Sequence, residues 1–252
     1  MAAKSIPVLD PERITTVIFD LDDTLRESEP RANEMVDLFL RSQGLELDWP
    51  RRRAAQLWEH QYWANSPELL ADEARLGDDT PAFWSHYSRL HLLALGLGEA
   101  QAESLGPKLR SYMQANYRPR NLLRPHTLET LAQLRASGLT LGVLTNRSRT
   151  VYHEMHTLGL DLFMDAFLTA GQLGAYKPEK QAFLNMLEFI GRRPEEVLYV
   201  GDNYYADVLG PHAAGIPAVL VNTKGLYEPS TEYPVIDYLN ELVPLLQRQP
   251  AR

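Results

Sequence analysis

Aspartates follow directly after two short apolar runs of the sequence. The first run ends at Phe19 and leads into Asp20 and Asp22, and the second ends at Val200 and leads into Asp202. If both runs are strands of one parallel sheet, their carboxyl ends deliver these side chains to one edge, where ligands bind in open α/β sheets. Carboxylates buried together repel one another unless a cation compensates them, and Mg²⁺ prefers such oxygen ligands. The spacing therefore predicts a magnesium site.

A hydroxyl and a lysine accompany these carboxylates. Thr145 and Asn146 follow another apolar run, and Lys177 precedes Pro178, a residue suited to the first turn of a helix. Phosphoryl transfer is the chemistry that fits this combination. One carboxylate can attack phosphorus, and a second one, two residues along an extended chain, can face the same side and exchange protons. The hydroxyl and the lysine would hold the phosphoryl oxygens as their charge redistributes.

The elements that must position these residues repeat one pattern, in which an amphipathic helix and a glycine precede an apolar run. Such runs between helices are typical of parallel strands buried on both faces, and glycine suits the left-handed position after a helix. We therefore predict an α/β fold, a Rossmann-like three-layer α/β/α core with a parallel sheet. The expected strands are 16–19, 139–144, 197–200 and 217–221, and the expected helices are 127–137, 181–190 and a last one at 235–246.

A long segment after the first strand has helical periodicity and no convincing strand run. Ser66-Pro67 and Thr80-Pro81 are typical helix starts, a capping residue followed by proline. All four tryptophans fall in this segment. We predict a discontinuous catalytic core of residues 1–25 and 118–252 and an inserted all-helical cap domain of residues 26–117.

Four ordered motifs of this sequence resemble those of the haloacid dehalogenase-like superfamily. They are Asp20-Leu-Asp22-Asp23-Thr24, Thr145-Asn146, Lys177-Pro178 and Gly201-Asp202-Asn203-x-x-x-Asp207. One such motif alone is weak evidence, whereas four in order, each on the expected element, form a specific signal. The resemblance covers the core end to end. The insert lies where the helical-cap phosphatase branch, which is phosphoglycolate phosphatase-like, places its cap.

The resemblance implies a role for each matching residue. Asp20 is expected to be the nucleophile, and Asp22 the general acid and base. Thr145, Asn146 and Lys177 are expected to bind the phosphoryl group, with Lys177 also offsetting the charge of Asp20. Since the dehalogenase members lack the second aspartate, the presence of Asp22 favours a phosphatase or phosphotransferase.

The resemblance also implies a metal site. Asp20, Asp202 and the backbone carbonyl of Asp22 are expected to bind Mg²⁺. For Asp207, three roles remain open: a metal ligand, a residue behind the ligands, or the group that orients Lys177.

The activity implied is Mg²⁺-dependent hydrolysis of a phosphomonoester, a small phosphorylated metabolite, through an aspartyl-phosphate. Two alternatives accompany it. A phosphomutase would pass the phosphoryl group to a sugar hydroxyl in place of water, and a non-catalytic binding or regulatory module would keep the fold alone. The intact set of Asp20, Asp22, Lys177 and Asp202 argues against the module, because only catalysis gives a reason to keep a costly charge cluster.

The bulk composition narrows the partners. The 33 acidic and 25 basic residues give a formal charge of -8, which works against non-specific nucleic-acid binding. There is no cysteine, so disulfides and thiolate chemistry are excluded. We see neither a signal-peptide stretch nor a membrane-spanning run and expect a cytoplasmic protein. His153 and His156 lie three apart without a third ligand, so we expect no zinc site there.

Overall fold

The computed structural model describes residues 6–247, which divide into two compact units. One unit comprises the chain up to Glu27 and from Leu122 onward, and the other is Ser28–Asn121. Both crossings between the units lie in a two-stranded ribbon of β2 (Arg26–Glu29) and β3 (Arg120–Leu123). Within the described residues, no helix combines the length and apolar character needed to cross a membrane.

The first unit is built on a six-stranded parallel sheet in the order β5-β4-β1-β6-β7-β8. Its inner strands are the expected apolar runs, and every residue of β1, β6 and β7 is buried. Strands covered on both faces need apolar side chains throughout, which explains the uninterrupted runs. The bounds are β1 Thr16–Phe19, β4 Thr140–Thr145, β5 Ala166–Thr169, β6 Val197–Gly201, β7 Ala218–Val221 and β8 Val235–Ile236.

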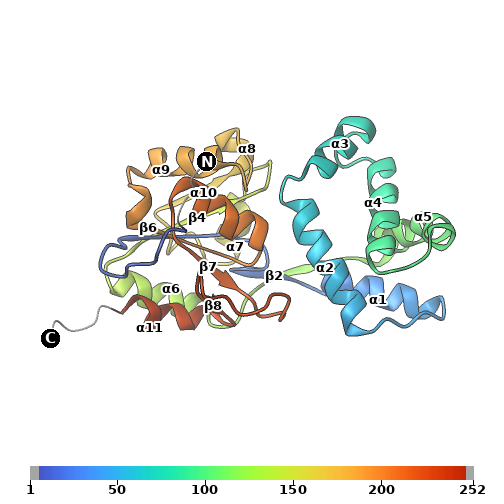
Figure 1. Ribbon diagram of the computed structural model, residues 1–252, viewed down its shortest axis with the longest axis horizontal. Helices are drawn as coiled ribbons and strands as arrows, with labels where there is room; N and C mark the ends of the chain where they lie inside the picture. Colours follow the sequence, from blue (N-terminus) through green and yellow to red (C-terminus); the bar gives the residue numbers. More distant parts are fainter. Residues whose placement is uncertain (1–5, 248–252) are drawn as a thin grey trace. The chain divides into compact units, whose positions relative to one another are not determined.

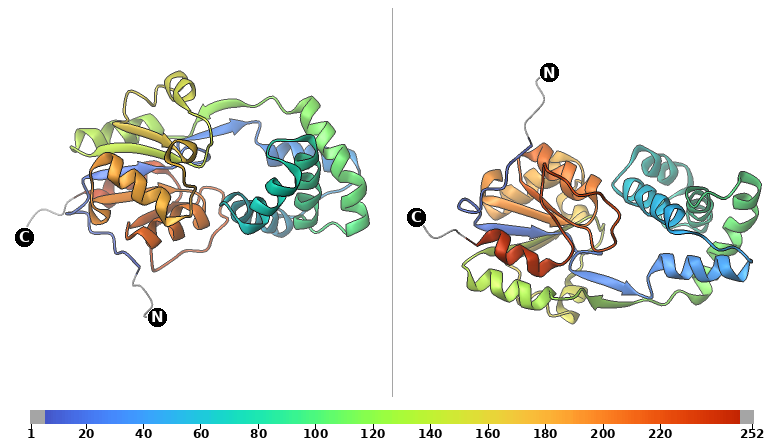
Figure 2. Two further views of the ribbon diagram at one scale, coloured as in Figure 1. Left: turned by 90° about the horizontal axis from the view of Figure 1, so that it is seen from above. Right: turned by 60° about the horizontal axis from the view of Figure 1, so that its bottom comes forward.

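Helices cover both faces of this sheet (Figure 1). Alternation along β1 sends Val17 and Phe19 into the core beneath α6 and α11, and Ile18 into the core beneath α9. Figure 2 shows α6 and α11 side by side on one face. The predicted three-layer α/β/α class is confirmed. The helices are α6 Thr127–Ala136, α7 Tyr152–Thr157, α8 Ala170–Leu173, α9 Lys180–Ile190, α10 Gly210–Ala214 and α11 Leu242–Leu246.

The second unit is helical. Its helices are α1 Ala32–Ser42, α2 Trp49–Trp63, α3 Pro67–Leu76, α4 Pro81–Ala94 and α5 Glu99–Asn116. The two predicted capping residues act as such: Ser66 accepts from the backbone N–H of Leu69 at 3.1 Å, and Thr80 from that of Phe83 at 3.1 Å. Each cap supplies an acceptor to an N–H group that the first turn of a helix leaves without a partner.

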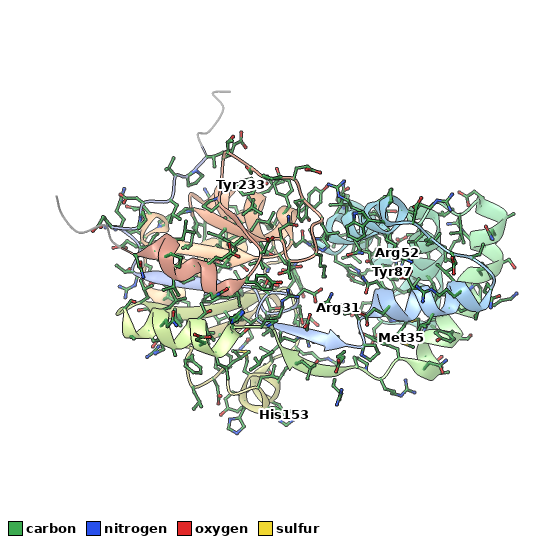
Figure 3. All side chains as sticks on the ribbon, turned by 90° about the horizontal axis from the view of Figure 1, so that it is seen from below. Arg31, Met35, Arg52, Tyr87, His153 and Tyr233 are labelled. Atoms are coloured by element: carbon green, nitrogen blue, oxygen red, sulfur yellow. The ribbon has the colours of Figure 1, made fainter. Side chains whose placement is uncertain are left out.

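Aromatic side chains of α2 and α4 form one core of this unit. Tyr62 is 1% exposed and packs against Trp58 and against Tyr87, which Figure 3 labels. The Tyr87 hydroxyl donates to Glu59 at 2.6 Å, and the Tyr62 hydroxyl donates to Asp72. These aromatic residues therefore pack as a core with their polar ends paired. That this unit acts as a cap stays a prediction.

Three local predictions were wrong. Residues 235–246 do not form one helix: Val235–Ile236 is strand β8, and α11 begins only at Leu242. The region after Arg26 was expected to lack strands, yet it starts with β2, whose sequence Arg-Glu-Ser-Glu carries no apolar signal. Pro178 does not open a helix, because α9 begins at Lys180 with Glu179 before it.

Candidate active site

The carboxyl ends of β1, β4 and β6 lie at one edge of the sheet, because β1 pairs in parallel with both of the others. Phe19 is opposite Val200 in the register, and the backbone N–H of Asp20 donates to the Val200 carbonyl at 2.8 Å. Thr145 is the last residue of β4 and is buried. The sheet therefore places the residue that follows β1 between the ends of its two neighbours, as the strand-end rule predicts.

Lys177 is the centre of the site, with a side chain that is 3% exposed. Its Nζ donates to Asp20 Oδ1 at 2.7 Å, to Asp207 Oδ1 at 2.8 Å and to the Tyr199 hydroxyl at 2.9 Å. These are all three donors that an ammonium group possesses. Burial alone lowers the pKa of Lys177, but attraction by Asp20 and Asp207 outweighs it and leaves the pKa well above its usual value. Lys177 is therefore buried and charged at neutral pH.

Asn146 fixes the backbone of Lys177. The Lys177 N–H donates to Asn146 Oδ1 at 2.7 Å, and Asn146 Nδ2 donates to the Lys177 carbonyl at 2.8 Å. This reciprocal pair ties the end of β4 to the segment before α9, two parts of the chain 31 residues apart. The structure thus gives Asn146 a role in holding the lysine, and its direct contact with a phosphoryl group stays a prediction.

Asp207 lies behind the lysine on a π-helical turn, Tyr204–Leu209. Its Oδ1 accepts from Lys177, its Oδ2 accepts from the backbone N–H of Asn203 at 2.9 Å, and the residue is 1% exposed. A Cβ atom at Gly201 would overlap this carboxylate, so glycine is required there. The contact with Lys177 supports the orienting role, while the position of Asp207 within the acidic cluster keeps a metal-ligand role open.

Asp20, Asp202 and Asp207 form an acidic cluster in which one oxygen of each lies within 4.8 Å of the others. Burial raises the pKa of Asp20 to about 7, since the nearby carboxylates add to it and Lys177 offsets only a part. Burial likewise raises the pKa of Asp202 well above its usual value, and Asp23 adds to it. Both shifts belong to the protein without a metal. The Thr24 hydroxyl donates to Asp202 at 3.2 Å.

This cluster fits Mg²⁺. The cluster has three carboxylates, of which Asp20 and Asp207 pair with Lys177, so a divalent cation would balance the remaining charge with the hard oxygen ligands that Mg²⁺ prefers. In the part of the chain that the structure describes, no other group of histidine and acidic side chains meets the spacing of a metal site. His153 lies exposed on α7 (Figure 3). The side chain of Asp22 is not part of this cluster, and binding of a metal by its backbone carbonyl stays a prediction.

The carboxylate of Asp22 contacts two arginines that sequence reasoning missed. Arg147 donates through Nε to Oδ2 and through Nη2 to Oδ1, both at 2.8 Å, and Arg26 also donates to Oδ1. Burial alone raises the pKa of Asp22, but these guanidinium groups outweigh it and lower the pKa. The sequence marks these arginines only weakly. Arg26 lies four residues after Asp22, and Arg147 directly follows the Thr145-Asn146 motif.

Two further polar residues of the site were not predicted. The Tyr199 hydroxyl accepts from Lys177 and donates to the Leu144 carbonyl at 2.9 Å. Its signal was a single polar atom in the otherwise apolar run of β6. Lys224, in the loop after β7, contacts Asp23 at 2.8 Å. No motif marks Lys224, which the fold brings across 201 residues.

A buried lysine paired with carboxylates at the carboxyl edge of a parallel α/β sheet is typical of an enzyme active site that binds a divalent metal ion. Comparison with known proteins agrees, because the family model described as haloacid dehalogenase-like hydrolase matches residues 14–215. The chain belongs to the haloacid dehalogenase-like hydrolase family. It is therefore an enzyme, a hydrolase, as the four motifs predicted.

Individual relatives cover most of the chain. It is 31% identical to the phosphoserine phosphatase of Thermus thermophilus over 83% of this chain and 89% of that protein. It is 27% identical to the phosphoglycolate phosphatase of Salmonella paratyphi A over 93% of each chain. The solved structure of a HAD-hydrolase from Bacillus subtilis, bound to magnesium, covers 94% of this chain and 100% of its own, with 23% identity and a TM-score of 0.58. This last likeness shows the shared fold.

Proposed function

We propose that the chain is a Mg²⁺-dependent phosphomonoester hydrolase that acts on a small phosphorylated metabolite through an aspartyl-phosphate. The observation that carries the proposal is the placement of Asp20, which follows β1 directly and accepts a hydrogen bond at 2.7 Å from the buried Lys177. The names of the two curated relatives, both phosphatases, support the same class of reaction.

Two half-reactions follow from the residues. In the first, a carboxylate oxygen of Asp20 attacks phosphorus, the bond from phosphorus to the ester oxygen breaks, and Asp22 gives that oxygen a proton. This requires Asp22 to be protonated once the anionic substrate is bound, since Arg147 and Arg26 lower its pKa in the free protein. In the second, Asp22 takes a proton from water as the water oxygen attacks phosphorus, and the bond to Asp20 breaks. Phosphate leaves, and both aspartates return to their starting states.

The cations of the site handle the charge. Lys177 stays protonated throughout and holds Asp20, while Thr145 would offer its hydroxyl to a phosphoryl oxygen. Mg²⁺, held by Asp20, Asp202 and the Asp22 carbonyl, would neutralise charge on the phosphoryl group when bound. Asp207 would act mainly by orienting Lys177. The helical unit Ser28–Asn121 would serve as a cap that selects the leaving group.

Phosphate release from p-nitrophenyl phosphate and from a panel of metabolites tests this proposal. Each assay is run with Mg²⁺, with EDTA, and with Asp20→Asn, and exposed Asp10→Asn serves as the matched control. We expect Asp20→Asn to lose roughly 10³-fold or more of the rate, as for other nucleophile substitutions. Turnover that persists in EDTA or in Asp20→Asn would refute the mechanism.

A further inference from the structure

Asp22 belongs to a closed ring of four charged side chains. Arg147 grips both of its oxygens in a fork of two 2.8 Å hydrogen bonds. Paired parallel hydrogen bonds of this kind fix the plane of a carboxylate as well as its position. Arg26 contacts the same carboxylate from within the chain segment that follows β1.

Glu154 closes the ring. It pairs with Arg147 Nη1 at 3.1 Å through one oxygen and with Arg26 Nε at 3.3 Å through the other. The side chains of Glu154 and Arg26 are 14% and 8% exposed, so these two groups are shielded from water. The ring joins three separate parts of the chain, namely the segment after β1, the segment after β4, and α7. Positive and negative groups alternate around it, so each neighbour stabilises the next.

We propose that Arg147 is a positioning residue that fixes the orientation of the Asp22 carboxylate toward the leaving-group oxygen, with Glu154 as its anchor. This inference rests on the proposed function, in which Asp22 exchanges protons with the substrate. Proton transfer requires a heavy-atom approach within hydrogen-bond reach, and a displacement of about 1 Å can lower a rate by about 10²-fold. A carboxylate on two single bonds has several rotamers, and the fork selects one.

Direct binding of substrate by Arg147 is the competing role, and the geometry disfavours it. All three guanidinium nitrogens are already engaged, two with Asp22 and the third with Glu154. The Nε/Nη2 edge is occupied by Asp22 and Nη1 already pairs with Glu154, so a phosphate could reach only the two N–H groups that remain of the five. Arg147 acts through Asp22, and its loss should therefore affect most the step that depends on Asp22.

The leaving group provides the test, because protonation matters little for a weakly basic leaving group and much for a basic one. The three probes are p-nitrophenyl, phenyl and benzyl phosphate, whose leaving groups rise in basicity at similar size. For Arg147→Met we expect kcat/KM to fall about tenfold to a hundredfold with benzyl phosphate and less than about threefold with p-nitrophenyl phosphate. Arg147→Lys should behave like Arg147→Met, because an ammonium group keeps the charge but cannot form the fork.

Two further variants anchor the interpretation. Glu154→Gln should steepen the leaving-group dependence in the same direction by a smaller factor, and exposed Arg149→Met, two residues from Arg147, should leave it unchanged. Equal losses on all three esters, a change confined to KM, or full rescue by Arg147→Lys would overturn the positioning role. Absence of Asp20-dependent turnover in the unsubstituted enzyme would instead overturn the proposed function, and this inference with it.

Discussion

Replacing Asp202 by asparagine should stabilise the metal-free protein. Asp202 shares a cluster with Asp20 and Asp207 in which the carboxylate oxygens lie within 4.8 Å of one another. At that distance and an effective dielectric constant of about 20, two fully ionised carboxylates repel by about 3 kcal/mol, an upper value here because the raised pKa of both acids favours proton uptake. Asparagine removes this repulsion and keeps an oxygen that can accept from Thr24.

The net gain is smaller than the summed repulsions, because the substitution also removes attraction to Lys224. We expect a net stabilisation of about 2 kcal/mol in EDTA at neutral pH, which for a chain of this size raises Tm by about 4–8 °C. The sign agrees with linkage. The pKa of Asp202 is raised in the folded state, so the unfolded chain ionises more readily and its ionisation at neutral pH favours unfolding.

Mg²⁺ should reverse the order of the two proteins. A cation at about 100 times its Kd stabilises the unsubstituted protein by about 2.7 kcal/mol, and Asp202→Asn should lose most of this response. Calorimetry and far-UV circular dichroism are the suitable assays. Tryptophan fluorescence is not, because all four tryptophans lie in the helical unit. Asp10→Asn is the control, and a lower Tm for Asp202→Asn in EDTA, or an undiminished response to Mg²⁺, would refute the reasoning.

Three other perturbations have defined signs. Lys177→Met removes the cation that pairs with both Asp20 and Asp207. Urea unfolding in EDTA should show that the free energy of unfolding falls by about 3–5 kcal/mol, and Mg²⁺ should restore part of the loss. Unchanged stability would contradict the pairing. Gly201→Ala places a Cβ against the Asp207 carboxylate. It should lower the free energy of unfolding by about 1–3 kcal/mol and reduce phosphatase activity. Unchanged values of both would show that the site adapts to the added methyl group. Burial lowers the pKa of His212, so acidification below about pH 6.5 protonates the unfolded chain first and removes stability. In urea unfolding from pH 7.5 to 5.5, the free energy of unfolding of His212→Gln should therefore depend less steeply on pH than that of the unsubstituted protein, by less than about 1.4 kcal/mol per pH unit. Identical slopes would exclude the effect.

The sequence predicted the parts of the fold whose signal is local. A strand covered on both faces, such as β1 or β6, must be apolar at every position, and the glycine after α9 marks its left-handed end at Gly191. The ribbon of β2 and β3 left no such trace. Arg26–Glu29 is polar and half-exposed, and its partner strand lies beyond the whole helical unit.

The last segment shows a conflict between two periods. Apolar residues from Val235 to Leu246 recur at helical spacing, yet the first two of these positions extend the sheet beside β7. The buried Ile236 and Leu242 belong to the same core, reached once from a strand and once from a helix. Periodicity reports which residues face the core and does not tell which element carries them there.

In the site, the sequence indicated the residues at strand ends and missed their partners. Asp20 and Lys177 could be brought together by the strand-end rule and the motifs, whereas Arg147 and Glu154 carry no pattern. The pairing of Arg147 with Asp22 and with Glu154 depends on how α7 packs after β4, a tertiary property. Tyr199 was missed because it belongs to a strand whose sequence is otherwise apolar, and only the fold brings its hydroxyl to Lys177.

The opposite signs expected for Asp202→Asn and Lys177→Met separate two explanations of the same buried charges. If the cluster were an ion-pair network kept for stability, removing either sign would leave partners unpaired, and both variants would be less stable. If the cluster holds an excess of negative charge reserved for a cation, removing an acid relieves repulsion while removing the lysine increases it. Two carboxylates already pair with Lys177, and Asp202 adds a third negative charge to the same cluster. Excess negative charge that destabilises the metal-free protein also gives the site its affinity for a divalent cation. Stabilisation by Asp202→Asn in EDTA would show this excess charge directly.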